Sequence, residues 1–536
     1  MSKRFVVCVA IWAAVLASFP LPAAAQFGRG GAEWMTSGSD AQRSFSIPTD
    51  PKISAEGMGK PGFEFLWKLK LNNEAVQLNS LTPAILMDRY IGYRGFRSFA
   101  FVAGSSNTVF AIDSDLARIE WQVHLSGAPS PAPGSLTCPG GLTAAIARAT
   151  TASYPVPGAG GGGLGGRGGP ARSGVGAPSE GAITIGPAIA AAAAAAAGPG
   201  RGPQFRQAAV IYAISSDGAL HGLYLSNGHE PAPPVKFLPA NSSAQGLTLV
   251  DNIAYAATGA CGGNQSGVWA VDISSNEVKQ WHPSAGAVAG SAGPAFGPDG
   301  TVYVSTTAGE LAALDPKTLS VKASYKAAGQ EFSSSPVVFA YKEKNYLATA
   351  TKDGRIYLFD ESLRTPLSTT QPISSDFTPA SVATFQANDT RWLLTAGSGA
   401  PSVSSGFQIF NGTVTKGAVA AWKLSEVNGS LTLQPAWVSR DLTSPLTPMV
   451  INGVVFAVSS GEYRTADATI SAAQRAQRSV PAVLYALDLN TGKSVWDSGN
   501  TITSFVHSGS LSGGASQLYI ETWDHHIYAF GYAIEH

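Results

Sequence analysis

The sequence contains few cysteines and few charged residues. Three cysteines occur in 536 residues, and charged side chains make up 13% of the chain, about half of the ~25% found in an average soluble domain. Lysine plus arginine and aspartate plus glutamate each number 35, so the formal net charge is zero, and no block of basic residues is present. We therefore expect neither nucleic acid nor an anionic membrane surface as a partner.

Several motifs that identify common enzymes are also missing. The chain has no Gly-x-Ser-x-Gly elbow, no His-Glu-x-x-His motif, no Cys-x-x-Cys-His haem attachment site and no Walker loop. These motifs place a nucleophile, a zinc ion, a haem or a nucleotide phosphate, respectively. Their absence excludes the most easily recognised classes of hydrolase, metalloprotease, c-type haem protein and nucleotide-binding protein.

The first 25 residues predict a cleavable secretory signal peptide. Lys3-Arg4 precede an apolar run over 5–16, and Ala23-Ala-Ala25 supply the small residues of a cleavage site before Gln26. The alternative, a membrane anchor, would require a longer apolar run. We therefore expect no membrane span, and a mature protein that is periplasmic or secreted.

A strand-turn-strand unit recurs along the chain, and its clearest copy is Ala486-Leu-Asp-Leu-Asn-Thr-Gly-Lys-Ser-Val-Trp496. Asp488 and Thr491 offer side-chain oxygens to a turn, Gly492 supplies the left-handed backbone position, and Trp496 lies on the next strand. The regular copies recur at about the 40 to 50 residues expected of a four-stranded propeller blade. Laid along the chain, the Asp position falls at Asp113, Tyr224, Asp272, Asp315, Asp360, Lys423, Asp488 and Gly531.

The unit resembles the pyrroloquinoline-quinone-type (PQQ-type) propeller repeat, whose pattern is Ala-x-Asp-x-x-Thr-Gly-x-x-x-Trp. The copy at 486–496 matches this pattern fully, and other copies keep about half of it. The resemblance implies an all-β fold, an eight-bladed β-propeller of four-stranded antiparallel blades. Apolar and polar side chains alternate over 65–71 as they do along a strand, and only six residues follow Phe530. We therefore expect this N-terminal strand to complete the last blade and close the ring.

The domain organisation follows from these features. We expect a signal peptide over 1–25, an N-terminal strap over 26–59 and the propeller over 60–536. Within the propeller, 156–204 is a Gly- and Ala-rich insertion that cannot bury enough apolar surface to fold alone, so we expect a flexible surface insertion. The strap carries Glu33-Trp-Met-Thr-Ser-Gly-Ser-Asp-Ala-Gln-Arg43, which is similar to the N-terminal segment of quinoprotein dehydrogenases. The alternative is a segment that only crosses the propeller rim.

Two cysteines remain after the signal peptide, with Cys8, is removed. Cys138 and Cys261 both lie in Gly-rich turns of neighbouring repeat units. An oxidising compartment favours their pairing, so we expect a disulfide. The alternative, two free buried thiols, stays open because the sequence does not supply the geometry that a disulfide requires.

The resemblance also implies candidate cofactors and site residues. A quinone enzyme requires an aromatic platform, a calcium ion held by oxygen ligands and an Asp base. Residues 257–264 are similar to the family segment that carries the calcium-binding Asn, so Asn264 is the candidate ligand for calcium and PQQ. Trp523 is the candidate platform and Asp524 the candidate catalytic base. For each of the three, the alternative is an ordinary turn or strand residue, and the repeated Asp113, Asp272, Asp315, Asp360 and Asp488 are expected to be structural.

Two hypotheses for the function remain. The favoured one is a non-catalytic, monomeric binding or scaffold module that holds an envelope protein, a peptide or a small molecule on the propeller face. The other is a PQQ- and calcium-dependent dehydrogenase of alcohols or sugars. The missing pair of adjacent cysteines and the missing haem site favour the binding module, whereas the Trp-to-Arg segment at 34–43 favours the enzyme.

Overall fold

A computed structural model describes residues 33–92, 95–129, 136, 138–154, 210–261, 263–465, 467, 469–507, 509 and 511–533. The predicted signal peptide and the predicted insertion at 156–204 lie outside these residues. The described chain is nearly all β, and none of its helices is both long and apolar enough to cross a membrane.

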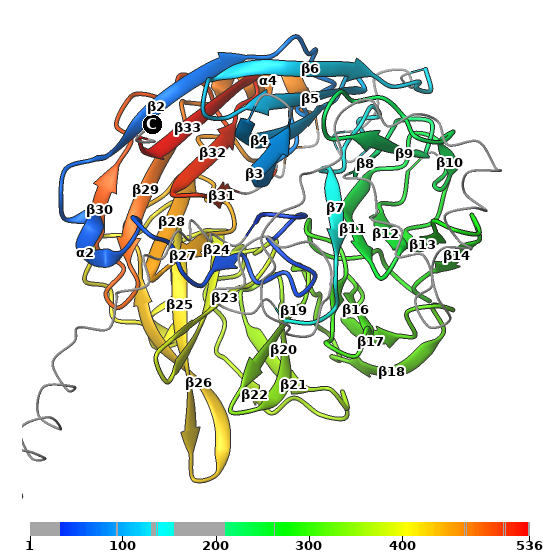
Figure 1. Ribbon diagram of the computed structural model, residues 1–536. Coiled ribbons are helices and arrows are strands. Elements are labelled where there is room, and N and C mark those ends of the chain that lie inside the picture. The colour runs from blue at the N-terminus through cyan, green and yellow to red at the C-terminus, as the bar shows by residue number, and fades with distance from the viewer. Residues whose placement is uncertain are drawn as a thin grey trace, which may run out of the picture.

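The strands form sheets that radiate from a central axis, and the first strand of each group of four lies nearest that axis (Figure 1). Five sheets have four strands. These are β3 (Ile85–Gly92), β4 (Gly95–Gly104), β5 (Thr108–Asp113) and β6 (Arg118–His124); β15 (Ala295–Phe296), β16 (Val302–Ser305), β17 (Glu310–Leu314) and β18 (Val321–Lys326); β19 (Val337–Tyr341), β20 (Lys344–Ala350), β21 (Ile356–Asp360) and β22 (Ser368–Thr369); β23 (Ala383–Ala387), β24 (Thr390–Ser398), β25 (Gly417–Val427) and β26 (Ser430–Val438); and β31 (Ser512–Gly514), β32 (Gln517–Glu521) and β33 (His526–Tyr532) with β2 (Phe63–Lys70).

Two further sheets are larger because neighbouring strands join them near the axis. One sheet has eight strands, β7 (Ala147–Thr150), β8 (Val210–Ile214), β9 (Ala219–Tyr224), β10 (Val235–Lys236), β11 (Ala244–Val250), β12 (Ile253–Thr258), β13 (Gly267–Asp272) and β14 (Val278–Trp281), and a parallel pairing of β7 with β11 joins its two halves. The other has five strands, β27 (Met449–Ile451), β28 (Val454–Ser459), β29 (Val483–Asp488), β30 (Ser494–Asp497) and β1 (Ser46–Ile47). Short helices at Ala55–Met58 (α2), Ala472–Arg478 (α4) and Val403–Ser405 (η1) lie in the connections.

A strand from the N-terminal part of the chain and the C-terminal strand meet in one sheet. Strand β2 pairs antiparallel with β33, so that Phe63 lies opposite Tyr532 and Lys70 opposite His526. Because β33 would otherwise be the edge of its sheet, this pairing covers backbone groups that could template aggregation. The strand expected at 65–71 is thus observed at 63–70, beside the C-terminal strand.

At two places the repeated turn is hydrogen-bonded to the sheet before it. The Asp488 carboxylate accepts hydrogen bonds from the backbone N–H of Thr491 (2.9 Å) and from its hydroxyl (2.7 Å). The indole of Trp437 on β26 packs on this turn and donates to the Leu489 carbonyl at 2.7 Å. Trp121 makes the equivalent bond to the carbonyl of Leu225 at 2.8 Å. The Asp, Gly and Trp of the repeat therefore form one contact between successive sheets. The same kind of turn bond is made by Asp113, Asp272, Asp315 and Asp360.

Replacing Gly492 by alanine should lower the free energy of unfolding by about 2 to 4 kcal/mol, because its φ is +68° and a Cβ there would overlap the Trp437 ring. Gly453→Ala is the matched control, since Gly453 has φ +82° but nothing within 4 Å of the added Cβ. It should cost only about 1 to 2 kcal/mol. If urea unfolding showed an equal loss of unfolding free energy in the two variants, the Trp437 contact would contribute nothing to stability.

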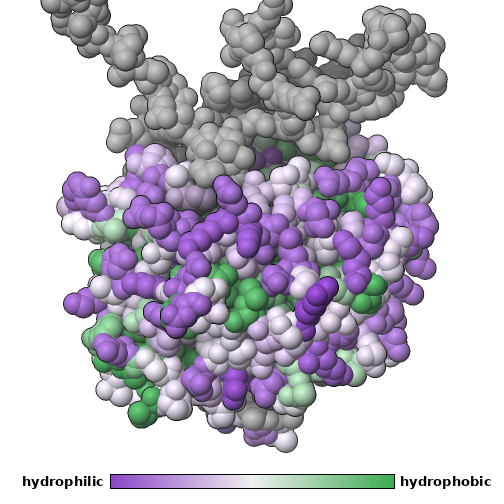
Figure 2. Space-filling view, turned by 90° about the horizontal axis from the view of Figure 1, so that it is seen from below, coloured by the Kyte–Doolittle hydropathy of each residue, from purple (hydrophilic) through white to green (hydrophobic). Residues whose placement is uncertain are grey.

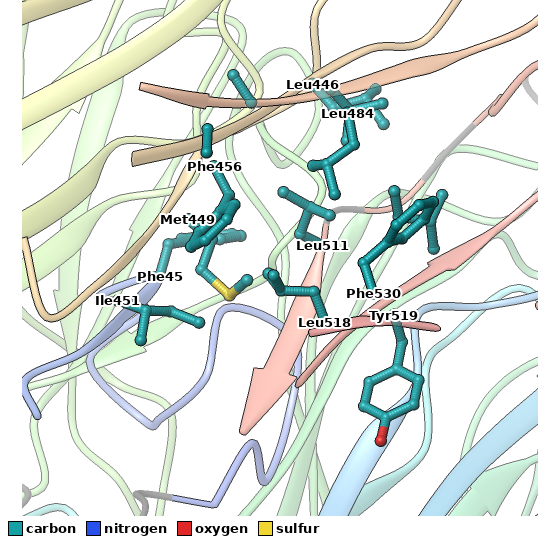
Figure 3. Packing of buried hydrophobic residues seen from close by; sticks show 14 of the residues in the cluster. Phe45, Leu446, Met449, Ile451, Phe456, Leu484, Leu511, Leu518, Tyr519 and Phe530 are labelled. Atoms are coloured by element: carbon teal, nitrogen blue, oxygen red, sulfur yellow. The ribbon is translucent and has the colours of Figure 1, made fainter. Parts of the chain in front are cut away.

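Apolar side chains fill the space between facing sheets. Phe45, Met449 and Ile451 are buried together where the strap meets β27. Figure 3 shows Leu511 and Leu518 pointing towards this group from the last sheet. Close packing of this kind fixes the position of the strap relative to the sheets.

Candidate functional site

The N-terminal strap runs through the centre of the ring of sheets. In Figure 1 the dark-blue chain crosses the middle, among the first strands of the sheets. Strap groups hydrogen-bond to seven of these first strands in chain order: Trp34 to Leu86, Met35 to Arg148, Thr36 to Leu247, Ala41 to Phe296, Gln42 to Val338, Ser44 to Thr384 and Phe45 to Val450. Apart from β7 and β11, which pair with each other, and β27, which pairs with β1 of the strap, a first strand pairs with another strand on one side only. The strap therefore supplies partners for backbone groups that face the axis. The alternative of a segment across the rim is therefore wrong.

Arg43 is fully buried in this central segment and has a hydrogen-bond partner for each guanidinium nitrogen. It donates to the carbonyls of Pro294, Ser37 and Gly246 and to the hydroxyls of Thr36 and Thr248, at 2.5 to 3.0 Å. Burial lowers the pKa of Arg43 to about 9, and the charge of Asp40 acts in the opposite direction. Burial also raises the pKa of Asp40, against hydrogen bonds from Ser44 that lower it. The guanidinium nitrogens are thus hydrogen-bonded within the protein and are not presented to a ligand.

A buried carboxylate of the β28–β29 connection lies beside a histidine of the β30–β31 connection. Glu462, 2% exposed, follows β28, and its oxygens lie 3.0 Å from His507 Nδ1 and 3.1 Å from Arg464 Nε. Burial alone would raise the pKa of Glu462, but the bonds and charges of His507 and Arg464 lower it below its usual value. This pair was not predicted from the sequence, because Glu462 and His507 lie 45 residues apart and match no motif.

A second buried carboxyl belongs to Glu521 at the end of β32. It is 7% exposed, and one of its oxygens accepts a hydrogen bond from the Ala84 N–H at 3.2 Å. Burial raises the pKa of Glu521 to about 8. Shifted pKa values of this kind are enriched at functional sites. The only signal in the sequence is an acidic residue that follows three apolar residues of a strand.

The candidate platform and base occupy the turn between β32 and β33. The Trp523 ring stacks on Phe505, with centroids 5.3 Å apart and planes at 20°. Asp524 accepts a hydrogen bond from the Thr522 hydroxyl at 2.6 Å and lies 3.1 Å from His526 Nδ1. The same bond from a hydroxyl to an Asp two residues later occurs between Thr351 and Asp353 at 2.6 Å. The Asp524 position is thus a repeated feature of these turns.

The candidate calcium ligand lies elsewhere in the ring. Asn264 follows β12, and its backbone N–H donates to the Cys261 carbonyl at 2.9 Å. Cys261 is joined by a disulfide to Cys138, with their Cα atoms 5.4 Å apart. Figure 1 places the β12–β13 connection and the β32–β33 connection on different sides of the ring. The structure therefore does not bring Asn264 together with Trp523 and Asp524.

These positions do not fit a site for PQQ and calcium. One face of the Trp523 ring is covered by Phe505, and Asp524 is engaged by Thr522 and His526. Within the part of the chain that the structure describes, no three His, Cys, Asp or Glu side chains are grouped so that they could hold a metal ion. A calcium site of the usual kind needs several oxygen ligands at one point.

A Ser-His-Glu arrangement also occurs in the β8–β9 region. Ser215 Oγ lies 2.8 Å from His221 Nε2, and His221 Nδ1 contacts Glu230. However, Ser215 is only 2% exposed and its hydroxyl is also bonded to the Asp217 carboxylate. A nucleophile must be reachable and must be able to transfer its proton to the histidine. We therefore assign this group a structural role.

The sequence matches no protein-family model and no characterised protein. The structure is similar to that of a quinohemoprotein alcohol dehydrogenase from Comamonas testosteroni, with a TM-score of 0.56, 12% identity and coverage of 96% of this chain and 82% of that chain. It is similar to a quinohemoprotein alcohol dehydrogenase from Pseudomonas putida HK5, with a TM-score of 0.52, 12% identity and coverage of 94% and 81%. BamB from Moraxella catarrhalis gives a TM-score of 0.47 at 14% identity, with coverage of 88% and 99%. A likeness at such identities concerns the fold and not the activity. The chain has the β-propeller fold of the PQQ-type repeat proteins.

Proposed function

We propose that the protein is an extracytoplasmic binding or scaffold module, which holds an envelope protein, a peptide or a small ligand on the surface of its propeller. One observation carries this proposal: the strap fills the axis, and the donors of the buried Arg43 are bonded to the protein itself. The outer surfaces and the loops are then the parts of the molecule that remain for recognition. Loops on a rigid scaffold are where binding residues are commonly found.

We also propose that the sheets are the eight blades of one closed ring, with the strap at 26–59 and the propeller at 60–536. The pairing of β2 with β33 supports closure by the N-terminal strand. The predicted signal peptide would export the chain to the periplasm or the outside of the cell, where we expect a monomer. The disulfide between Cys138 and Cys261 supports this location, since disulfides persist in oxidising compartments.

A PQQ- and calcium-dependent dehydrogenase of alcohols or sugars is the second candidate. It is favoured by two buried carboxyls, Glu462 and Glu521, whose pKa values are shifted in opposite directions. Shifted pKa values of buried carboxyls are enriched at functional sites. It ranks second because Asn264, Trp523 and Asp524 are not arranged to hold the cofactor.

The deciding experiment is a calorimetric titration of the purified mature protein with pyrroloquinoline quinone in the presence of calcium chloride, followed by a dye-linked oxidation assay on alcohols and sugars. We expect no stoichiometric binding and no turnover above background. A quinohemoprotein dehydrogenase freed of its quinone serves as the positive control. Stoichiometric binding with turnover would overturn the proposal and establish the enzyme.

A further inference from the structure

A groove lies at the edge of the ring between the β19–β22 sheet and the hairpin formed by β25 and β26. Its cavity volume is about 640 Å³, and its lining includes Glu343, Asn345, Asp360, Glu361, Leu367 and Leu431. Figure 1 shows the hairpin projecting beyond the neighbouring sheets, with β20 to β22 beside it. Figure 2 views this edge of the molecule, where hydrophilic side chains surround scattered apolar ones. The groove exists because β22 has two residues, whereas β25 has 11 and β26 has nine.

The wall formed by β26 offers unpaired backbone groups to the groove. Val427 pairs with Ser430 across the tip of the hairpin, and the pairing continues to Ala420 with Val438. On the outer side of β26, the Leu433 N–H donates to the Ser368 hydroxyl at 3.3 Å. Residues two apart on a strand direct their backbone groups to the same side. The N–H and C=O of Leu431 therefore point outward, towards the groove that Leu431 lines.

The opposite wall is the outer side of β21, where the Leu358 carbonyl accepts from the Leu367 N–H at 2.7 Å and the Asp360 carbonyl accepts from the Leu363 N–H at 3.3 Å. The outer strand β22 pairs with β21 only at Tyr357 with Thr369 and Leu358 with Ser368. Beyond Leu358, the outer side of β21 up to Asp360 has no strand beside it in the described structure. An extended segment can therefore lie between the end of β21 and the edge of β26, and exposed Leu367 of the groove lining offers it apolar contact.

The lining of the groove is acidic. Glu343, Asp360 and Glu361 face one lysine, Lys344. Glu361 accepts a hydrogen bond from the Asn345 amide at 2.9 Å, while Glu343 makes no hydrogen bond or ion pair with any residue that the structure describes. The neighbouring Lys342 does not neutralise this charge, because it pairs at 2.7 Å with Glu426 of the hairpin. The groove thus carries an excess of negative charge next to free backbone donors and acceptors.

We propose that this groove binds an extended, basic peptide segment of a partner protein. The segment adds to the free edge of β26 at Leu431 and places a lysine or arginine among Glu343, Asp360 and Glu361. Backbone hydrogen bonds give such strand addition its affinity, and complementary charge gives it specificity. The inference rests on the proposed binding function and names the chemistry of the partner. An anionic lipid surface would be repelled by the same carboxylates.

The test uses the full mature chain and a fluorescein-labelled decapeptide of alternating lysine and threonine as the probe, with alternating glutamate and threonine as the control peptide. We expect saturable one-to-one binding of the basic peptide only. The double variant Glu343→Gln/Glu361→Gln should weaken binding at least about tenfold. The matched variant Glu277→Gln/Glu331→Gln removes two exposed carboxylates outside the groove and should leave binding unchanged. Hydrogen exchange should show new protection at 429–433 when the basic peptide is bound.

Three results would overturn the proposal. These are no saturable binding of the basic peptide, an equal loss of affinity in both double variants, or full competition by spermine without protection at 429–433. The third result would identify a site for small polyamines and not for a peptide. Each result is distinguishable from failure of the proposed function, which the quinone titration decides on its own.

Discussion

Replacing Arg43 by methionine should lower the free energy of unfolding by about 3 to 5 kcal/mol, the range measured when one partner of a buried charged network is removed. Methionine fills part of the volume but leaves the Pro294 carbonyl without its Arg43 donor, and it removes one of the hydrogen-bond partners of the Gly246 carbonyl and of the Thr248 hydroxyl. Each buried acceptor left unpaired costs about 1 to 3 kcal/mol. Urea unfolding followed by tryptophan fluorescence measures the change.

Two further variants test whether the loss of stability comes from the buried hydrogen bonds of Arg43. Arg43→Lys keeps a charge but supplies three donors and not five, so it should fall between the wild type and Arg43→Met. Arg118→Met removes a half-exposed arginine whose contact with Glu120 is 3.5 Å long, and it should change stability by no more than about 0.5 kcal/mol. A loss below about 1 kcal/mol in Arg43→Met would mean that the central segment does not hold the sheets together.

The stability of the wild type should fall as the pH rises from about 4.5 to about 8, because Glu521 is buried in a site that favours its neutral form. Burial raises the pKa of Glu521 from 4.5 to about 8 in the folded protein. The folded state therefore keeps a proton that the unfolded state has lost, so stability present below pH 4.5 is lost as the pH rises through the folded pKa. At about 1.4 kcal/mol per pKa unit, the total is on the order of 4 to 5 kcal/mol.

Glu521→Gln should remove this pH dependence, since a glutamine amide does not titrate. The variant should be close to the wild type at pH 4 and clearly more stable at pH 9, as read from Tm across that range. Glu64→Gln on the exposed face of β2 is the control and should follow the wild-type curve. Parallel curves for wild type and Glu521→Gln would contradict a neutral buried carboxyl.

The features that could be predicted from the sequence are those built from neighbouring residues. The turn at Asp488 needs Thr491 and Gly492, which follow within four positions, so its chemistry is visible in a short window. The recurrence of this turn then predicts the propeller fold, and the Trp that packs on the next turn explains why the repeat ends in that residue.

The site could not be predicted because it is built from distant residues. The partners of Arg43 at Gly246 and Pro294 lie 203 and 251 residues away along the chain. No local sequence pattern predicts that the strap lies at the axis. Asn264 and Trp523 were assigned to one site only through a family resemblance, and such a resemblance does not show whether the two loops that carry them lie close together. The groove at Leu431 depends on the difference in length between β22 and β26, which belong to two separate sheets.

Hydrogen exchange of the segment 34–47, read by mass spectrometry on the mature protein, tests the central claim most directly. If this segment fills the axis, its amides should exchange as slowly as those of β28, which lies in the interior of its sheet. Exchange as fast as that of the exposed hairpin tip at Asn428 and Gly429 would contradict the account. The axis would then be open to a ligand, and a quinone site at the axis would again be a candidate.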